Sequence, residues 1–200
     1  MTFTLDGLLK MAWRTVTNPR EGAEEVLALG IPRQALWPAL LLVVVLSMIL
    51  SVLTNAVLEA SGDPAREDIF ANPLALGVIE VGFLVLIAAA IYVIGRNMGG
   101  RGSFEEGLLL VIWLQFILVC ASALQLGALM ISGFIAVLIS FASVVLFLWL
   151  LTHFVAVVHG FRSLAQVFVM ILVSMIGISF VLVMVLAILG IDVPMPSEGA

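Results

Sequence analysis

The sequence contains few charged residues. Only 10% of its 200 residues are Asp, Glu, Lys or Arg, and 64% are hydrophobic, whereas soluble domains have about 25% charged residues. A soluble fold of this size cannot bury so much apolar surface. The composition therefore excludes a soluble enzyme, a disordered chain and a nucleic-acid-binding module. The single cysteine, Cys120, argues against a disulfide framework or a zinc site. We expect an integral membrane protein.

The stretches without charge predict how often the chain crosses the membrane. Residues 34–58 and 107–161 contain no Asp, Glu, Lys or Arg, and residues 69–95 contain one acid, Glu80. About 20 apolar residues span the hydrocarbon core as a helix. The interval 107–161 is too long for one such helix, so it must fold back. Gly127, Ser132 and Gly133 supply turn chemistry near its middle. A further apolar run follows this interval.

The predicted fold class is an all-α integral membrane protein with five transmembrane helices in one bundle and an N-terminal interfacial amphipathic helix. The spans are predicted at about residues 35–57, 74–95, 108–127, 134–157 and 164–189. Residues 1–33 form a cytoplasmic segment, residues 34–190 the five-helix domain, and residues 191–200 a short outer tail.

The basic residues predict the orientation. Seven of the eight lie before the first predicted span, between spans two and three, or between spans four and five, and the exception is Arg66. Lys and Arg concentrate in cytoplasmic loops. We therefore expect a multi-pass protein of the cytoplasmic (inner) membrane, with its N-terminus in the cytoplasm and its C-terminus outside.

The N-terminal segment has the pattern of an amphipathic helix. Leu5, Leu9 and Trp13 gather on one side with other apolar residues, whereas Lys10 and Arg14 face away from them. Such a helix lies in the headgroup plane, with its basic residues near anionic lipid and its tryptophan among the upper acyl carbons. We prefer this anchoring role to a dedicated partner-binding surface.

Glu80 is the one formal charge inside a predicted span, so it is a functional-site hypothesis. At 1.5 Å per residue from Pro73, it lies about 10 Å below the outer boundary. Ser51, Asn55 and Ser140 lie at comparable depths and are predicted to hydrogen-bond to it. One interpretation is a neutral carboxyl held by neighbouring helices, and the other is a proton or cation site. We prefer the first, because no second intramembrane charge completes a relay.

Two further polar residues, Gln115 and His153, lie toward the cytoplasmic side of the third and fourth predicted spans. They are predicted to hydrogen-bond across the hairpin, which is the common use of such residues in membrane bundles. The sequence contains no cluster of Cys, Asp and His that would indicate a metal site. It also contains no G-x-S-x-G motif, which would indicate a hydrolase. We expect no catalytic residue, no metal and no cofactor.

The loop between the second and third spans reads Gly-Arg-Asn-Met-Gly-Gly-Arg-Gly-Ser-Phe-Glu-Glu-Gly over residues 95–107. Gly99 and Gly100 can end the preceding helix in the left-handed conformation, and Ser103 with Glu106 predicts a capping box for the next helix. No strand precedes the glycines and no Gly-Lys-Ser/Thr follows them, which argues against a nucleotide site. The loop amides, together with nearby arginines, can hold an anionic lipid headgroup.

This loop, with the apolar run after it, resembles the signature of the Yip-one family of small multi-pass proteins related to Ypt/Rab-interacting proteins. Residues 159–165, His-Gly-Phe-Arg-Ser-Leu-Ala, look like the family's short loop before its last helix. The resemblance covers about residues 20–190 and implies five spans with a cytoplasmic N-terminus. In eukaryotic relatives it implies association with prenylated Rab-type GTPases, but this chain lacks their long soluble N-terminal region. It is similar to the compact bacterial branch.

We expect a non-enzymatic membrane-organising or interaction protein that contacts lipids or partner proteins through its cytoplasmic loops. The predicted contact residues are Arg96, Gly99, Gly100, Arg101, Ser103, Phe104 and Arg162, assisted by the interfacial helix. The expected partners are membrane lipids, including anionic headgroups, and a membrane protein or a second copy of the chain, but no nucleic acid. The alternative function is a small transporter, channel or lipid-moving protein that uses Glu80.

Overall fold

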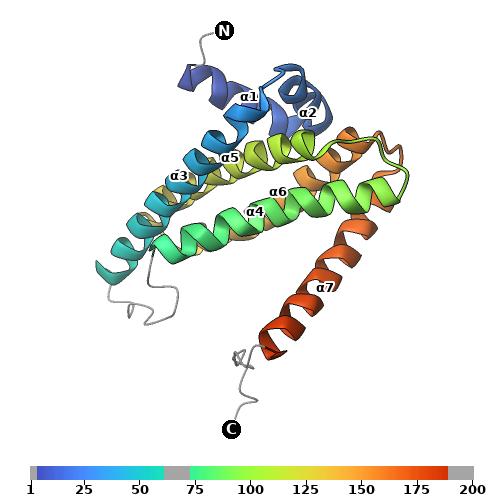
Figure 1. The fold of residues 1–200 in the computed structure, drawn as a ribbon. Helices are drawn as coiled ribbons and strands as arrows, with labels where there is room; N and C mark the ends of the chain where they lie inside the picture. The colour runs from blue at the N-terminus through green and yellow to red at the C-terminus, as the bar shows by residue number, and fades with distance from the viewer. Residues whose placement is uncertain (1–3, 61–72, 189–200) are drawn as a thin grey trace.

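The computed structural model describes residues 4–60 and 73–188, and within these ranges the protein is built from helices alone (Figure 1). Two short helices, α1 (Leu5–Thr17) and α2 (Pro19–Ala28), come first. The long helices that follow are α3 (Arg33–Ala60), α4 (Pro73–Asn97), α5 (Phe104–Leu129), α6 (Gly133–His159) and α7 (Leu164–Ile188). The predicted outer tail, residues 191–200, lies outside the described residues.

Four helices of the described chain, α3 to α6, are long and apolar enough to cross a bilayer. They coincide with the first four predicted spans. The fifth predicted span falls on α7, whose described apolar stretch, Leu164–Phe180, is shorter. The helices extend past the predicted limits because backbone hydrogen bonding continues beyond the apolar residues.

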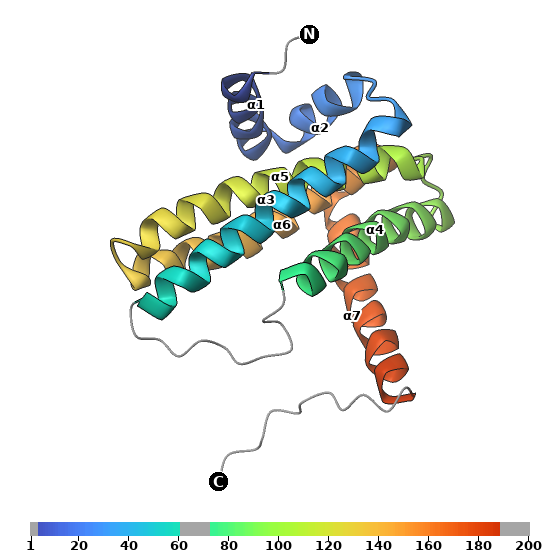
Figure 2. The same cartoon turned by 60° about the vertical axis from the view of Figure 1, so that its left-hand side comes forward.

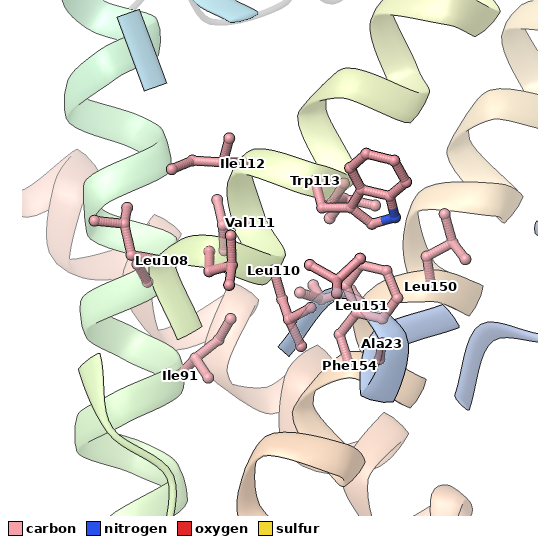
Figure 3. Close-up of a cluster of buried hydrophobic side chains, with 14 of the residues drawn as sticks. Ala23, Ile91, Leu108, Leu110, Val111, Ile112, Trp113, Leu150, Leu151 and Phe154 are labelled. Atoms are coloured by element: carbon pink, nitrogen blue, oxygen red, sulfur yellow. The ribbon is translucent and has the colours of Figure 1, made fainter. Parts of the chain in front are cut away.

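Helix α5 lies at the centre of the bundle and contacts α2, α3, α4 and α6. Residues 107–114 of α5 are all buried, on every side of the helix. An all-round apolar helix belongs in the interior of a bundle. Figure 3 shows the neighbours that surround this stretch: Ala23 of α2, Ile91 of α4, and Leu150, Leu151 and Phe154 of α6.

The predicted hairpin in the long uncharged interval is present. Helix α5 ends at Leu129 and α6 begins at Gly133, with Ser132 at the N-cap position. Gly127 lies inside α5 rather than in the turn. The two helices pack against each other along the hairpin.

Helices α1 and α2 form a cap that is attached to α5 (Figure 2). The Trp113 indole N–H donates to the hydroxyl of Thr15 at 3.1 Å, and that hydroxyl donates to the Met11 carbonyl at 2.9 Å. Thr15 is fully buried, and a Cβ at Gly22 would lie 2.7 Å from the Thr15 Cα. The turn at Asn18 thus brings Gly22 of α2 against Thr15 and helps to bury it. Pro19 occupies the first position of α2, and Asn18 makes no side-chain capping bond.

Helix α1 has two apolar faces rather than one. Ala12 and Thr15 point into the protein, whereas Leu5, Leu9 and Trp13 remain exposed at 69%, 45% and 71%. The exposed residues follow one another at intervals of four, so they form a stripe along the helix. The predicted helix is present, and its place at the membrane interface stays a prediction.

We predict that Thr15→Val weakens the attachment of the cap. The substitution leaves the buried Trp113 N–H without an acceptor, which costs about 1–3 kcal/mol. Thermal unfolding of the purified protein in detergent should therefore show a lower midpoint. Thr17→Val is the matched control, because the Thr17 hydroxyl is exposed and bonds only to carbonyls of its own helix. Equal effects of the two substitutions would contradict this account of the contact.

Candidate functional site

A single carboxyl group joins three helices inside the bundle. Glu80 of α4 accepts a hydrogen bond from Gln115 of α5, with Nε2 at 2.5 Å from Oε1. Ser47 of α3 donates to the same carboxyl, and its Oγ lies 2.7 Å from Oε1 and 2.5 Å from Oε2. Glu80 is therefore held from both sides, by one residue of α3 and one of α5.

These bonds correct the predicted partners of Glu80. Ser51, Asn55 and Ser140 are exposed side chains, and the carboxyl is bonded by Ser47 and Gln115 instead. Ser47 lies one helical turn from Ser51 on the same face of α3. Depth counting along α3 thus selected the correct face and the wrong turn, because it takes no account of helix tilt.

The predicted bond between Gln115 and His153 is also wrong. Gln115 bonds to Glu80, whereas the Nδ1 of His153 lies 2.7 Å from the Trp149 carbonyl, one turn earlier in α6. The His153 ring packs against the Trp149 indole, with 4.3 Å between the ring centroids. His153 is 9% exposed and serves the packing of its own helix.

The Glu80 cluster can satisfy the carboxyl in either protonation state. Ser47 Oγ lies 3.1 Å from the Val44 carbonyl as well as within bonding distance of Glu80. A protonated Glu80 can donate to Ser47 while Ser47 donates to Val44 and Gln115 donates to the other carboxyl oxygen. The described residues contain no group of three or more His, Cys, Asp or Glu that could hold a metal ion. This arrangement favours a carboxyl that ties helices together.

A buried histidine joins the two loops at one end of the bundle. We call this end the loop end. It is formed by residues 96–103, which are the last residues of α4 and the loop to α5, and by residues 160–163 between α6 and α7. His159 is 3% exposed. Its Nδ1 accepts from the Gly102 N–H at 3.2 Å, and its Nε2 lies 2.9 Å from the Ile91 carbonyl. Because the Gly102 N–H can only donate, this geometry requires the hydrogen on Nε2, which donates to Ile91.

Three glycines make room for the His159 ring. A Cβ at Gly95 or Gly100 would overlap the imidazole, and a Cβ at Gly102 would overlap the Val158 side chain and lie 2.9 Å from the Val158 carbonyl oxygen. His159 was not among the predicted site residues. The signal that could have found it is the run of small residues in the other loop, because close-packed glycines need a partner that fills their space.

Helix α4 ends before the glycines, as predicted, but of Gly99 and Gly100 only Gly99 has the left-handed conformation, with φ of 87°. The Gly100 N–H donates to the Gly95 carbonyl at 2.9 Å, and the Gly99 N–H donates to the Arg96 carbonyl at 3.0 Å. This is the pattern of a Schellman motif. Gly100 is therefore needed for its small volume and not for its backbone angle.

The predicted capping box of α5 is also present. The Ser103 N–H donates to the Glu106 carboxylate at 2.8 Å, and the Glu106 N–H donates to the Ser103 hydroxyl at 3.2 Å. Phe104 packs against the core. The amides of Gly99, Gly100, Gly102 and Ser103 are thus all engaged within the protein. These four amides are therefore not free to hold an anion, contrary to the prediction for the loop amides, and the predicted role of the arginine side chains is not tested by these bonds.

Three arginines at the loop end have no carboxylate partner within the described parts of the chain: Arg96, Arg101 and Arg162. All three are exposed. The Arg96 guanidinium lies 5.7 Å from the centre of the Tyr92 ring, which leaves its charge unneutralised. The four basic residues nearer the N-terminus are paired instead: Lys10 with Asp6, Arg14 with Glu25, Arg20 with Glu24, and Arg33 with Glu105.

A cleft of about 490 Å³ lies between α4 and α7, with α5 and α6 behind it. Figures 1 and 2 show α7 diverging from the other long helices on this side. The lining is apolar except for Glu80, Gln115, Ser174 and Ser179. Glu80 and Gln115 bond to each other, and the Ser174 hydroxyl donates to the Met170 carbonyl of its own helix. Glu80 is the one acidic or basic residue among the described lining residues, so the cleft contains no chain of groups for a proton relay.

The sequence profile of the Yip1 domain matches residues 13–187, which is most of the chain. The protein belongs to the Yip1 domain family. No curated protein and no solved structure gave a match. The Yip1 match confirms the resemblance drawn from two segments, residues 95–107 and 159–165. In this Yip1 domain those two segments touch each other, because Gly95, Gly100 and Gly102 pack against His159.

Proposed function

We propose that this Yip1-domain protein is a non-enzymatic membrane protein whose loop end binds anionic lipid headgroups. In this proposal α7 is the fifth span, and the protein lies in the cytoplasmic membrane with its N-terminus inside and its C-terminus outside. The loop end then faces the cytoplasm, since its two loops follow the second and the fourth span. The observation that carries the proposal is a group of three arginines, Arg96, Arg101 and Arg162, that have no carboxylate partner among the described residues.

Arginines at this position suit a phosphate. The ends of membrane-spanning helices lie at the headgroup level, and guanidinium groups bind phosphate oxygens in pairs. Each basic residue near an anionic membrane surface contributes about 1 kcal/mol. The exposed stripe of Leu5, Leu9 and Trp13 supports α1 as an interfacial helix beside this surface. Lys10 and Arg14 contribute less to lipid binding, because acids of the protein already neutralise them. A membrane protein or a second copy with an acidic surface is the competing partner.

The test replaces the three loop-end arginines together. We expect Arg96→Gln/Arg101→Gln/Arg162→Gln to weaken binding of phosphatidylglycerol about a hundredfold, since three contributions of about 1 kcal/mol are removed. The measurement is a titration of the purified protein in neutral detergent, with bound lipid counted by native mass spectrometry. Binding of phosphatidylcholine should change little, because its headgroup has no net charge.

A matched control removes the same amount of charge elsewhere. Arg14→Gln/Arg20→Gln/Arg33→Gln deletes three paired arginines and is expected to leave phosphatidylglycerol binding within a few-fold of the parent. If the control loses as much affinity as the loop-end variant, net charge and not the loop end governs binding. If neither variant loses affinity, the proposal is wrong.

A further inference from the structure

The cleft between α4 and α7 has a shape that a lipid chain can fill. Four helices line it, and its apolar walls include Leu84 and Ile87 of α4, Leu114 of α5, Leu151 of α6 and Ile171 of α7. Its volume of about 490 Å³ is within the range of ligand sites in proteins, about 300–1,000 Å³.

The cleft continues to the loop end. A second hollow shares Ile94, Met170 and Ser174 with it and adds Met98, Ala165 and Gln166. Met98 immediately follows α4, and Ala165 and Gln166 belong to the first turn of α7. Arg96 precedes Met98 by two residues and Arg162 precedes Ala165 by three. The apolar space therefore begins beside the loop end, to which these two arginines belong.

The length of the cleft matches an acyl chain that enters from the loop end. Its lining on α4 runs from Ile94 to Glu80, about 21 Å at 1.5 Å per residue. One leaflet of the hydrocarbon core is about 15 Å deep. An acyl chain of a lipid in the leaflet at the loop end thus fits along the cleft. The hydrogen-bonded pair of Glu80 and Gln115 lies at the end of the cleft that is far from the loop end.

We infer that the cleft between α4 and α7 holds one acyl chain of an anionic phospholipid from the surrounding bilayer, with the headgroup at Arg96, Arg101 and Arg162. The position of the headgroup rests on the proposed function, whereas the position of the chain rests on the cleft alone. The apolar lining selects the chain, and the three arginines select a negative headgroup. A neutral lipid satisfies only the first of these two requirements.

The test uses the full chain in nanodiscs that contain phosphatidylglycerol with a photoreactive diazirine in one acyl chain. Val111, Leu114, Leu151 and Val155 are at most 5% exposed and line the cleft. A lipid on the outer surface of the bundle cannot reach these side chains. We therefore expect cross-linked peptides to include them, and Ala90→Trp, which fills the cleft from α4, to lower this labelling about tenfold, as loss of contact with about two methylene groups would do.

Matched variants separate filling of the cleft from a general effect of tryptophan. Val93→Trp on α4 and Ile176→Trp on α7 change exposed positions outside the cleft and should preserve the labelling. Ser174→Trp fills the cleft from α7 and repeats the test if Ala90→Trp does not yield folded protein. Labelling confined to exposed residues in the parent would overturn the inference. So would equal labelling of the parent and both cleft-filling variants, or copy-to-copy cross-links at α7 in place of lipid.

The same experiment distinguishes failure of the chain site from failure of the headgroup site. If the loop-end triple variant keeps the labelling of Leu114 and a phosphatidylcholine probe labels it equally, the cleft holds a chain and the choice of an anionic lipid is wrong. If the triple variant loses phosphatidylglycerol binding and the parent never labels Leu114, the headgroup site stands and the cleft site falls.

Discussion

Gly95→Ala is expected to lower the free energy of unfolding by about 3 kcal/mol. The added Cβ would overlap the His159 imidazole, and the ring can move only by giving up its bonds to Ile91 and Gly102. Overpacking costs about 1–3 kcal/mol, and a buried polar group left unpaired costs about as much. The measurement is reversible unfolding of the purified protein in mixed micelles, followed by circular dichroism.

Gly82→Ala provides the control on the same helix. Nothing lies within 4 Å of the position that its Cβ would take, so the substitution should stabilise α4 by up to about 1 kcal/mol through helix propensity. His159→Ala in the Gly95→Ala background should recover part of the loss, because the overlap disappears with the ring. If Gly95→Ala and Gly82→Ala have the same effect, the ring does not hold the loop end together.

Glu80→Leu and Gln115→Leu are each expected to cost about 1–3 kcal/mol, and the double variant is expected to cost much less than their sum. Glu80→Leu leaves the Gln115 amide without its partner, and Gln115→Leu leaves the Glu80 carboxyl with Ser47 alone. Replacement of both by apolar residues of similar size removes the unpaired groups and is often close to neutral. A double-mutant cycle on the unfolding midpoint and the free energy of unfolding measures this coupling.

Asn55→Leu serves as the control for that cycle. Asn55 is exposed on α3 and does not bond to Glu80, so its effect should add to that of Glu80→Leu. If Asn55 couples to Glu80 in such a cycle and Gln115 does not, the partners predicted from depth are correct after all. Additive effects of Glu80→Leu and Gln115→Leu would show that their hydrogen bond contributes nothing to stability.

The helices could be predicted from the sequence because few backbone conformations are stable inside a membrane. Each stretch without charge has to satisfy its own amides in the hydrocarbon core, and only a helix does so within one segment. The uncharged interval 107–161 was too long for one helix, so a hairpin followed from its length, and Ser132 and Gly133 indicated where the turn lies. The caps at Ser103 and Gly99 were predictable because each depends on local residues.

The contacts between helices could not be predicted in the same way. Gln115 was recognised as a buried polar residue, but its partner depended on how α5 is rotated against α4 and α6. Ser47 and Ser51 lie on the same face of α3, and only the packed bundle places Ser47 against Glu80. Sequence spacing gives the face of a helix, whereas tilt and rotation decide which turn of that face meets a neighbour.

The glycines of the loop show a second limit. In the sequence, a glycine that is needed for a left-handed backbone looks the same as one that is needed for lack of volume. Gly99 is of the first kind and Gly100 of the second. The difference depends on His159, which lies 59 residues after Gly100 and in another helix. The role of the arginines stays a prediction.

The central position of α5 has a consequence for the order in which the protein assembles. A chain is synthesised from its N-terminus, so α3 and α4 enter the membrane before the helix that both of them pack against. Ser47 precedes Glu80 in the chain and can bond to it while α3 and α4 are a pair. Gln115 arrives later and completes the carboxyl's contacts when α5 inserts. Insertion of α5 therefore adds the helix against which α3 and α4 can pack and against which α6 packs afterwards.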